Sequence, residues 1–241
     1  LFTAGHLTPQ TIPVLTEGPF DAIAITIATG GSHTGVAALG TSLTTQQAAQ
    51  LRGQSRQPIV ATDPDLAGRI AAERDYWLLA AQGLDPRHAQ LPDGQDPADL
   101  IAHDPQRLAA ALTNSAPLAD VLIDERLAHL DADRAALDAV AVLAAQPPER
   151  WTAGCEHVAK RTGLPSSLIR SVLVGMVRSW NNDPRKAAEH HLDAARGVKQ
   201  RLTEAGAPAV SGDQHERIPA GQTGLRPELP RNTGATAQRR E

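Results

Sequence analysis

Acidic residues follow apolar segments repeatedly in the first hundred residues of this chain. Glu17 and Asp21 come after "IPVLT", and Asp63 and Asp65 come after "PIVAT". Carboxylates at this spacing repel each other unless a cation or a hydrogen-bond donor lies between them. Carboxylates without histidine or thiolate neighbours favour hard divalent ions such as Mg²⁺ or Mn²⁺. The pattern therefore predicts a site for a divalent cation.

A third acidic pair, Asp96 and Asp99, follows the next apolar segment, "HAQLP". A single DxD pattern is more often a turn or a helix cap than a metal site. Three acidic groups at successive strand ends are harder to explain in that way. Two divalent ions about 4 Å apart can clamp the attacking and leaving oxygens of a phosphoryl transfer. Gly18, beside Glu17, leaves room for a substrate phosphate.

The elements that must position these acids alternate between strand and helix. Strands are predicted at residues 11–16, 34–40, 57–63 and 88–92, and helices at 21–31, 44–53 and 66–83. Connections of this length give right-handed crossovers and a mostly parallel sheet covered on both faces. Ligands bind outside the carboxyl ends of the strands in such sheets. We therefore expect an α/β fold in which Glu17 and Asp63 lie on the same edge.

The second half of the chain has a different pattern. From Pro105 the sequence predicts helices only, at residues 105–114, 117–131, 133–146, 150–163, 166–180 and 184–206. Residues 205–241 are rich in Gly, Pro, Gln, Thr and Arg and have few large apolar side chains, so they predict a disordered tail. The predicted domains are 1–104, an α/β catalytic domain, then 105–204, an all-α helical domain, and finally the tail, 205–241.

Composition and charge narrow the class of protein. No apolar run approaches the roughly 20 residues needed to span a bilayer, so a cytoplasmic protein without a membrane partner is expected. The single cysteine, Cys155, excludes an internal disulfide and a zinc ribbon and is expected to fill space in the core. Residues 1–105 carry 5 Lys and Arg against 11 Asp and Glu, whereas residues 151–201 carry 9 against 4, so the second region suits phosphate contacts. A chain that begins at Leu1 is expected to be a fragment or a processed product.

Several aromatic residues and histidines have simpler interpretations. Tyr76 is expected to pack inside its helix, and Trp151 and Trp180 are expected to anchor the helical core. His190 and His191 are adjacent, so on a helix their side chains point about 100° apart. They are therefore poor joint metal ligands and are expected on a solvated surface.

Four stretches, read together, resemble one known family. "VLTEGPFDAIAITIATGG", "GVAALGTSLTTQQAAQL", "IVATDPDLAGRIAAER" and "LPDGQDPADLI" resemble, in the same order, the Toprim domain of bacterial DnaG-type primases. The resemblance runs through about residues 12–104, and "ALGTSLT" and "DLAGR" are typical of the primase branch. The next stretch, "APLADVLIDERLAHLD", resembles the helical part that completes the polymerase core of those enzymes.

The resemblance implies an activity and its partners. The activity is that of a DNA-directed RNA polymerase, a nucleotidyltransferase that makes short RNA primers for DNA replication. It needs Mg²⁺ or Mn²⁺, nucleoside triphosphates and a single-stranded DNA template, and the resemblance also suggests a replicative helicase as a partner. The basic subdomain and the cysteine-rich zinc domain that precede Toprim in the family do not occur in this sequence.

The resemblance also implies roles for the acidic residues. Glu17 would ligate metal or act as an acid or base, and Asp21 would support it. Asp63 and Asp65 would bind the divalent ions, with Pro64 between them where the family often has glycine. Since proline keeps the preceding residue extended, this change suits a strand end.

The late acidic motif of the family is only partly matched. Asp96 corresponds to its first aspartate, but Ala98 stands where the second is expected, so neighbouring Asp99 is the candidate replacement as a metal ligand. Gly40 and Thr41 match the "GT" turn that lies beside the site in the family. They are predicted, with Gly18, to contact the nucleotide.

Basic residues supply candidate phosphate contacts. Arg69 and Arg74 lie on the helix predicted after the DxD motif and either meet substrate phosphates or pair with acidic neighbours on that helix. Lys160 and Arg161 lie in the basic region and are candidate contacts to the template. The alternative for Lys160 and Arg161 is an ordinary solvated surface.

Two other functions fit the same residues. A Toprim nuclease or topoisomerase-like enzyme would cleave phosphodiester bonds with the same metals, although a type IA topoisomerase needs a nucleophilic tyrosine and the chain has only Tyr76. A non-catalytic nucleic-acid-binding module would rely on the basic region instead.

Overall fold

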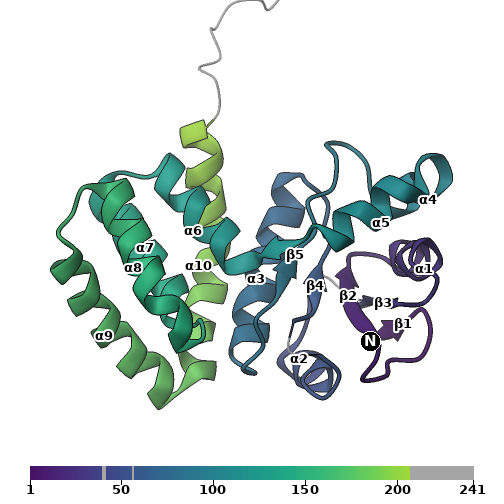
Figure 1. Cartoon of the computed structure of the whole chain (residues 1–241), viewed down its shortest axis with the longest axis horizontal. Helices are drawn as coiled ribbons and strands as arrows, with labels where there is room; N and C mark the ends of the chain where they lie inside the picture. Colours follow the sequence, from purple (N-terminus) through teal and green to yellow (C-terminus); the bar gives the residue numbers. More distant parts are fainter. Residues whose placement is uncertain (40–41, 56, 207–241) are drawn as a thin grey trace, which may run out of the picture. The chain divides into compact units, whose positions relative to one another are not determined.

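The computed structural model of this chain describes residues 1–39, 42–55 and 57–206 (Figure 1). These residues belong to one compact unit. The predicted tail lies, from residue 207 onward, outside the described part, and so do Gly40 and Thr41. The predicted division at residue 104 stays a prediction.

A six-stranded mixed sheet forms the α/β part of the fold, as expected. Its strands are β1 (Phe2–Thr3), β2 (Ile12–Thr16), β3 (His33–Ala37), β4 (Ile59–Val60), β5 (Arg87–His88) and β6 (Ala116–Pro117), in the order β1-β3-β2-β4-β5-β6. The four central strands run parallel, with Val14 of β2 opposite Gly35 of β3 and Ile59 of β4. The prediction of a mostly parallel sheet is therefore confirmed.

The two edge strands were not predicted. β1 pairs with β3 and β6 pairs with β5, both antiparallel. Because β6 lies at residues 116–117, the prediction of helices only from Pro105 is wrong there. The Arg87 side chain fixes this edge, since its Nε donates to Ser115 Oγ at 3.0 Å and its Nη2 donates to the Ser115 carbonyl. Strands of two residues are too short to show a period in the sequence.

Most helices begin and end close to the predicted positions, but the helix at Pro97–His103 was not predicted. They are α1 (Pro19–Ala28), α2 (Thr45–Leu51), α3 (Leu66–Ala80), α4 (Pro97–His103), α5 (Pro105–Thr113), α6 (Leu118–His129), α7 (Ala132–Ala144), α8 (Trp151–Thr162), α9 (Ser166–Asn182) and α10 (Pro184–Gly206), with a 3-10 turn, η1 (Pro148–Arg150). Thr44 caps α2 as predicted, because its hydroxyl accepts from the Gln47 N–H at 3.2 Å. None of the described helices is long and apolar enough to cross a membrane.

Apolar clusters cover both faces of the sheet. Val14 and Ile59 belong to one cluster, together with residues of α1, α4 and α5. Leu15 and Val60, the next residues along the same strands, belong to the other cluster, together with residues of α2, α3 and α6–α10. Successive strand residues point to opposite faces, so β2 and β4 each contribute to both cores. The second cluster joins the sheet to the helical region.

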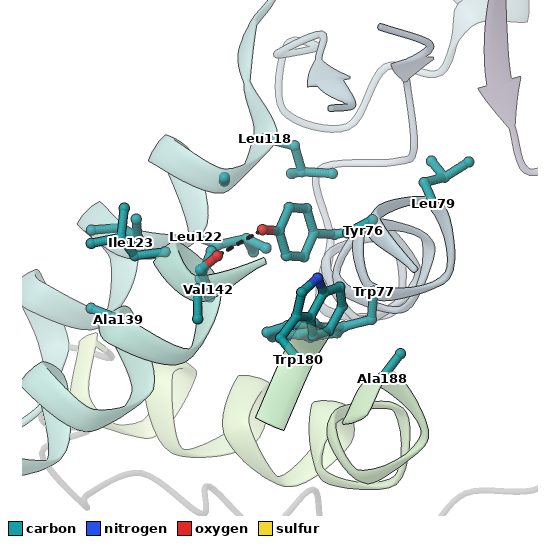
Figure 2. Packing of buried hydrophobic residues seen from close by; sticks show 14 of the residues in the cluster. Tyr76, Trp77, Leu79, Leu118, Leu122, Ile123, Ala139, Val142, Trp180 and Ala188 are labelled. Atoms are coloured by element: carbon teal, nitrogen blue, oxygen red, sulfur yellow. Dashed lines mark hydrogen bonds between the residues drawn. The ribbon is translucent and has the colours of Figure 1, made fainter. Parts of the chain in front are cut away.

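Aromatic side chains lie at the centre of this second cluster (Figure 2). Tyr76 is buried and its hydroxyl donates to the Val142 carbonyl at 2.9 Å, which confirms its packing role. The rings of Trp77 and Trp180 are 6.0 Å apart. His191 stacks on Trp77 with ring centroids 3.9 Å apart, and burial lowers the pKa of His191 to about 4. The prediction of a solvated surface is therefore wrong for His191, because α10 packs against α3.

Buried charges connect three helices in the same region. Glu73 of α3, Arg126 of α6 and Lys199 of α10 are each at most 2% exposed. Arg126 donates to Glu73 Oε1, and Lys199 Nζ lies 3.4 Å from Glu73 Oε2 and donates to Glu125. Burial opposes ionisation of Glu73, but the two cations outweigh it and lower the pKa of this carboxyl. Glu73 is thus a buried carboxylate between two buried cations.

Candidate active site

The first two acids meet at the carboxyl ends of two neighbouring strands. Glu17 directly follows β2 and Asp63 comes after β4, and these strands pair in parallel. The Asp63 N–H donates to Glu17 Oε1 at 3.1 Å. The predicted edge of the sheet therefore brings Glu17 and Asp63 together.

Asp21 ties two helix starts to each other. Its Oδ2 accepts from the Gly18 N–H at 3.1 Å, and its Oδ1 accepts from the Ala98 N–H at 3.3 Å. Gly18 caps α1 and Ala98 lies in the first turn of α4. Burial and the charge of Asp96 raise the pKa of Asp21. Asp21 is thus placed to support the site, by holding the late acidic motif beside α1.

Asp65 and Asp96 each cap a helix. Asp65 Oδ1 accepts from the Gly68 N–H at 2.7 Å and caps α3, and Asp96 Oδ1 accepts from the Asp99 N–H at 2.6 Å and caps α4. Each cap uses one oxygen of the carboxylate, and no described residue donates a hydrogen bond to the second oxygen of either aspartate. Helix capping and ligand binding are therefore compatible in both residues.

These acids line one open pocket. Asp63, Asp65, Asp93, Asp96 and Asp99 surround a volume of about 380 Å³. Burial and, after it, the charges of the neighbouring carboxylates, Glu17 most of all, together raise the pKa of Asp63 to about 6. A bound cation would relieve this repulsion.

The described side chains of this pocket are of the right type for a divalent ion, but they are not in position to bind one. Carboxylates alone are the donor set that a hard divalent ion prefers. Within residues 1–39, 42–55 and 57–206, however, no three His, Cys, Asp or Glu side chains lie in position to hold one metal ion together. The donor set therefore fits a divalent ion, but the carboxylates would have to rotate to coordinate it.

The basic candidates lie elsewhere. Arg69 Nη2 donates to Thr203 Oγ1 at 2.9 Å, and Arg74 Nη1 donates to the Leu192 carbonyl at 3.1 Å, so both side chains contact α10. Neither pairs with an acid on its own helix within the described part of the chain. Lys160 and Arg161 are exposed in the last turn of α8 and do not line the acidic pocket. The structure thus does not bring them to the acidic pocket.

Gly68 allows α3 to approach the peptide of Asp63. A Cβ atom at Gly68 would lie 2.1 Å from the Asp63 carbonyl oxygen. We expect Gly68→Ala to lower the free energy of unfolding by about 1–3 kcal/mol, because the backbone must move apart. Gly175→Ala is the matched control, since a Cβ there meets nothing and alanine favours a helix. Urea unfolding of both variants checks this, and equal stability of Gly68→Ala and wild type would contradict it.

A second pocket, of about 300 Å³, lies beside the acidic one and was missed from the sequence. Glu17 lines it, and so do Thr62 and Asp75, which are 4% and 8% exposed. The signal in the sequence was weak: Asp75 is an acid inside the apolar stretch "RDYWLL", and Thr62 precedes the DxD motif.

Comparison with known proteins finds similarity to a Toprim-like family and to DNA primases. Residues 14–101 match the family model described as Toprim-like. Over 88 residues the chain is 44% identical to the DNA primase of Halalkalibacterium halodurans, an alignment that covers 36% of this chain. The chain spans 14% of the length of that relative.

Solved structures show the same fold. A DNA primase domain from Pseudomonas aeruginosa has a TM-score of 0.57 and 22% identity, over 68% of this chain and 55% of that one. A DnaG primase catalytic domain bound to ssDNA has a TM-score of 0.55 and 23% identity, over 67% and 54%. These likenesses extend beyond residue 101, into the helical region.

Proposed function

We propose that this chain is a primase-like Toprim protein that carries the catalytic site of a metal-dependent nucleotidyltransferase, one that makes RNA primers. Residues 14–101 match the Toprim-like family model, and 88 residues are 44% identical to a DNA primase. One observation carries the proposal: four of the acids predicted at strand ends line one pocket, and a fifth is hydrogen-bonded to one of these four. Asp63, Asp65, Asp96 and Asp99 line it, and Glu17 accepts from the Asp63 N–H. A site that bound only apolar ligands would not need so many carboxylates, without cationic partners, at one edge of the sheet.

In this proposal each acid has a distinct role. Asp63 and Asp65 would hold a divalent ion, Mg²⁺ or Mn²⁺, and Asp96 and Asp99 are further candidate ligands. When bound, such an ion supplies Lewis-acid stabilisation to the transferring phosphoryl group. Glu17 is placed to ligate that ion or to exchange a proton near Asp63. Asp21 is a positioning residue, because it acts through the backbone of Gly18 and Ala98.

The proposed partners are nucleoside triphosphates and a single-stranded DNA template. The solved DnaG catalytic domain bound to ssDNA, which shares this fold, supports the template. The exposed cations Lys160 and Arg161 remain candidates for distant template phosphates, and Gly18 remains a candidate for the nucleotide. A replicative helicase is a further proposed partner.

A topoisomerase-like cleavage function lacks an accessible tyrosine nucleophile among the described residues. The hydroxyl of Tyr76, the only tyrosine of the chain, donates to a carbonyl inside the core, so it is not available as the nucleophile of a topoisomerase. A metal-dependent nuclease would use the same acids, so an experiment has to distinguish cleavage of the template from primer synthesis.

Primer synthesis on single-stranded DNA tests the proposal. Wild type, Asp63→Ala and the control Asp133→Ala are incubated with labelled ribonucleotides and Mg²⁺ or Mn²⁺, and template cleavage is scored in the same lanes. Asp133 is exposed in the first turn of α7. We expect metal-dependent short RNA that falls at least about a hundredfold in Asp63→Ala and is unchanged in Asp133→Ala.

The other outcomes have definite meanings. Cleavage without synthesis would replace the proposal with the nuclease. If neither product forms, calorimetric titration with Mn²⁺ decides. Binding that Asp63→Ala abolishes would show a catalytic site that needs the rest of a longer primase, and no binding would leave a non-catalytic module.

A further inference from the structure

The 300 Å³ pocket beside the acidic site has the composition of a small-molecule site. Its walls are mostly apolar, from Leu15, Val36, Leu43 and Ala71, with a few polar groups among them. Ligand pockets typically have roughly 300–1,000 Å³ and this mixture of apolar walls and a few placed polar groups. The size and the lining therefore admit one flat organic group.

Two buried polar side chains in this pocket lack partners. Thr62 Oγ1 is fully buried and makes no hydrogen bond. The Asp75 carboxyl is 8% exposed and makes no hydrogen bond or ion pair with any described residue. Buried polar groups are normally hydrogen-bonded, because an unmade bond costs stability. A ligand that offers hydrogen bonds to both groups would account for them.

The pocket is connected to the acidic site through one residue. Glu17 lines the 300 Å³ pocket, and its Oε1 accepts from Asp63, which lines the acidic pocket. A molecule with phosphates at the acids could therefore place its other end beside Thr62 and Asp75. In a nucleotide the other end is the base.

The polar groups favour one kind of base. A carboxylate accepts two parallel N–H donors well, as it does from arginine. Guanine offers such a pair, N1–H and the 2-amino group, whereas adenine offers one donor next to an acceptor. Hypoxanthine keeps N1–H and lacks the 2-amino group. Comparing the affinities of guanine and hypoxanthine nucleotides therefore measures the contribution of the second hydrogen bond.

We propose that this pocket binds the guanine base of a nucleotide whose phosphates lie at the acidic pocket, with the Asp75 carboxylate accepting from N1–H and the 2-amino group and the Thr62 hydroxyl bonding to the same base. This inference rests on the proposed function for the identity of the ligand as a nucleotide. It adds a base-specific site to it. A primase-like enzyme with such a site would favour guanosine triphosphate over other nucleotides at that site.

Equilibrium binding to the whole chain tests the inference without relying on synthesis. The affinities of GTP, ITP and ATP are measured by calorimetry with Mn²⁺ at pH 8, where the Asp75 carboxyl is ionised, for wild type, Asp75→Asn, Thr62→Val and the control Asp133→Asn. We expect wild type to bind GTP about tenfold more tightly than ITP or ATP, from one lost charge-assisted hydrogen bond. Asp75→Asn should remove this preference, Thr62→Val should weaken GTP severalfold, and Asp133→Asn should match wild type.

A filled pocket provides a second, independent variant. Ala71→Leu places three more carbons in the pocket and should weaken GTP at least tenfold while thermal unfolding shows a folded chain. Equal affinities for GTP, ITP and ATP in wild type, or a GTP preference that survives Asp75→Asn, would overturn the inference, as would undetectable GTP binding. Primer synthesis that depends on Asp63 but shows no base preference would sink the inference and leave the proposed function standing.

Discussion

Arg126→Ala is expected to lower the free energy of unfolding by about 3–5 kcal/mol, because it leaves a buried carboxylate without its main partner. Arg126 is 2% exposed and donates to Glu73, which is 1% exposed. Lys199 alone would face Glu73 across 3.4 Å, without the hydrogen bond from the guanidinium. Denaturant unfolding near neutral pH, where Glu73 is ionised, measures the loss.

A triple variant distinguishes the two possible causes of this loss of stability, the unpaired buried charge and the lost side-chain packing. Replacing Glu73 with Leu and both Arg126 and Lys199 with Met removes the buried charges together and keeps similar volume. Such replacements are often neutral or stabilising, so the triple variant should unfold within about 1–2 kcal/mol of wild type or above it. If it is as unstable as Arg126→Ala, the charge explanation is wrong and the cost lies in packing.

Asp75→Asn should gain stability over wild type as the pH rises, by up to about 4 kcal/mol between pH 4 and pH 8. Burial raises the pKa of Asp75 from its usual 3.8 to about 7. Below pH 4 the carboxyl is protonated in both states and contributes no difference. Between the two pKa values the unfolded chain ionises freely and the folded chain does not, so wild type loses stability as pH rises. Above pH 7 the loss is complete.

Thermal or urea unfolding of both proteins at several pH values measures this difference. Asp133→Asn is the control, because Asp133 is exposed and its replacement should leave the pH profile of wild type unchanged. Parallel pH profiles for Asp75→Asn and wild type would show that the Asp75 carboxyl is solvated in the folded chain. A buried acid that lowers stability at neutral pH is unusual outside functional sites.

Much of the fold follows from local pattern. The alternation of strands and helices fixed the parallel sheet, and with it the meeting of Glu17 and Asp63 at one edge. The edge strands β1 and β6 could not be predicted, because each has two residues and pairs with distant segments. His191 was assigned to the surface because the sequence of α10 alone does not reveal that α10 lies on Trp77 of α3.

The site was predictable in part for the same reason. Acids at strand ends can be recognised from the sequence once the strands are known, and the caps by Asp65 and Asp96 follow standard spacing. Asp75 and Thr62 could not be found, because their importance depends on lacking partners in a folded pocket. The contacts of Arg69 and Arg74 with α10 depend on tertiary packing in the same way.

The packing of α10 on α3 has a consequence for synthesis of the protein. Contacts from Arg74 to Leu192 and from Arg69 to Thr203 span 118 and 134 residues of chain. On the ribosome, β2, β4 and their acids emerge long before α10, so α3 waits with Trp77 and Glu73 uncovered while the intervening helices are made. Contacts this distant in sequence form late and leave apolar surface open to aggregation.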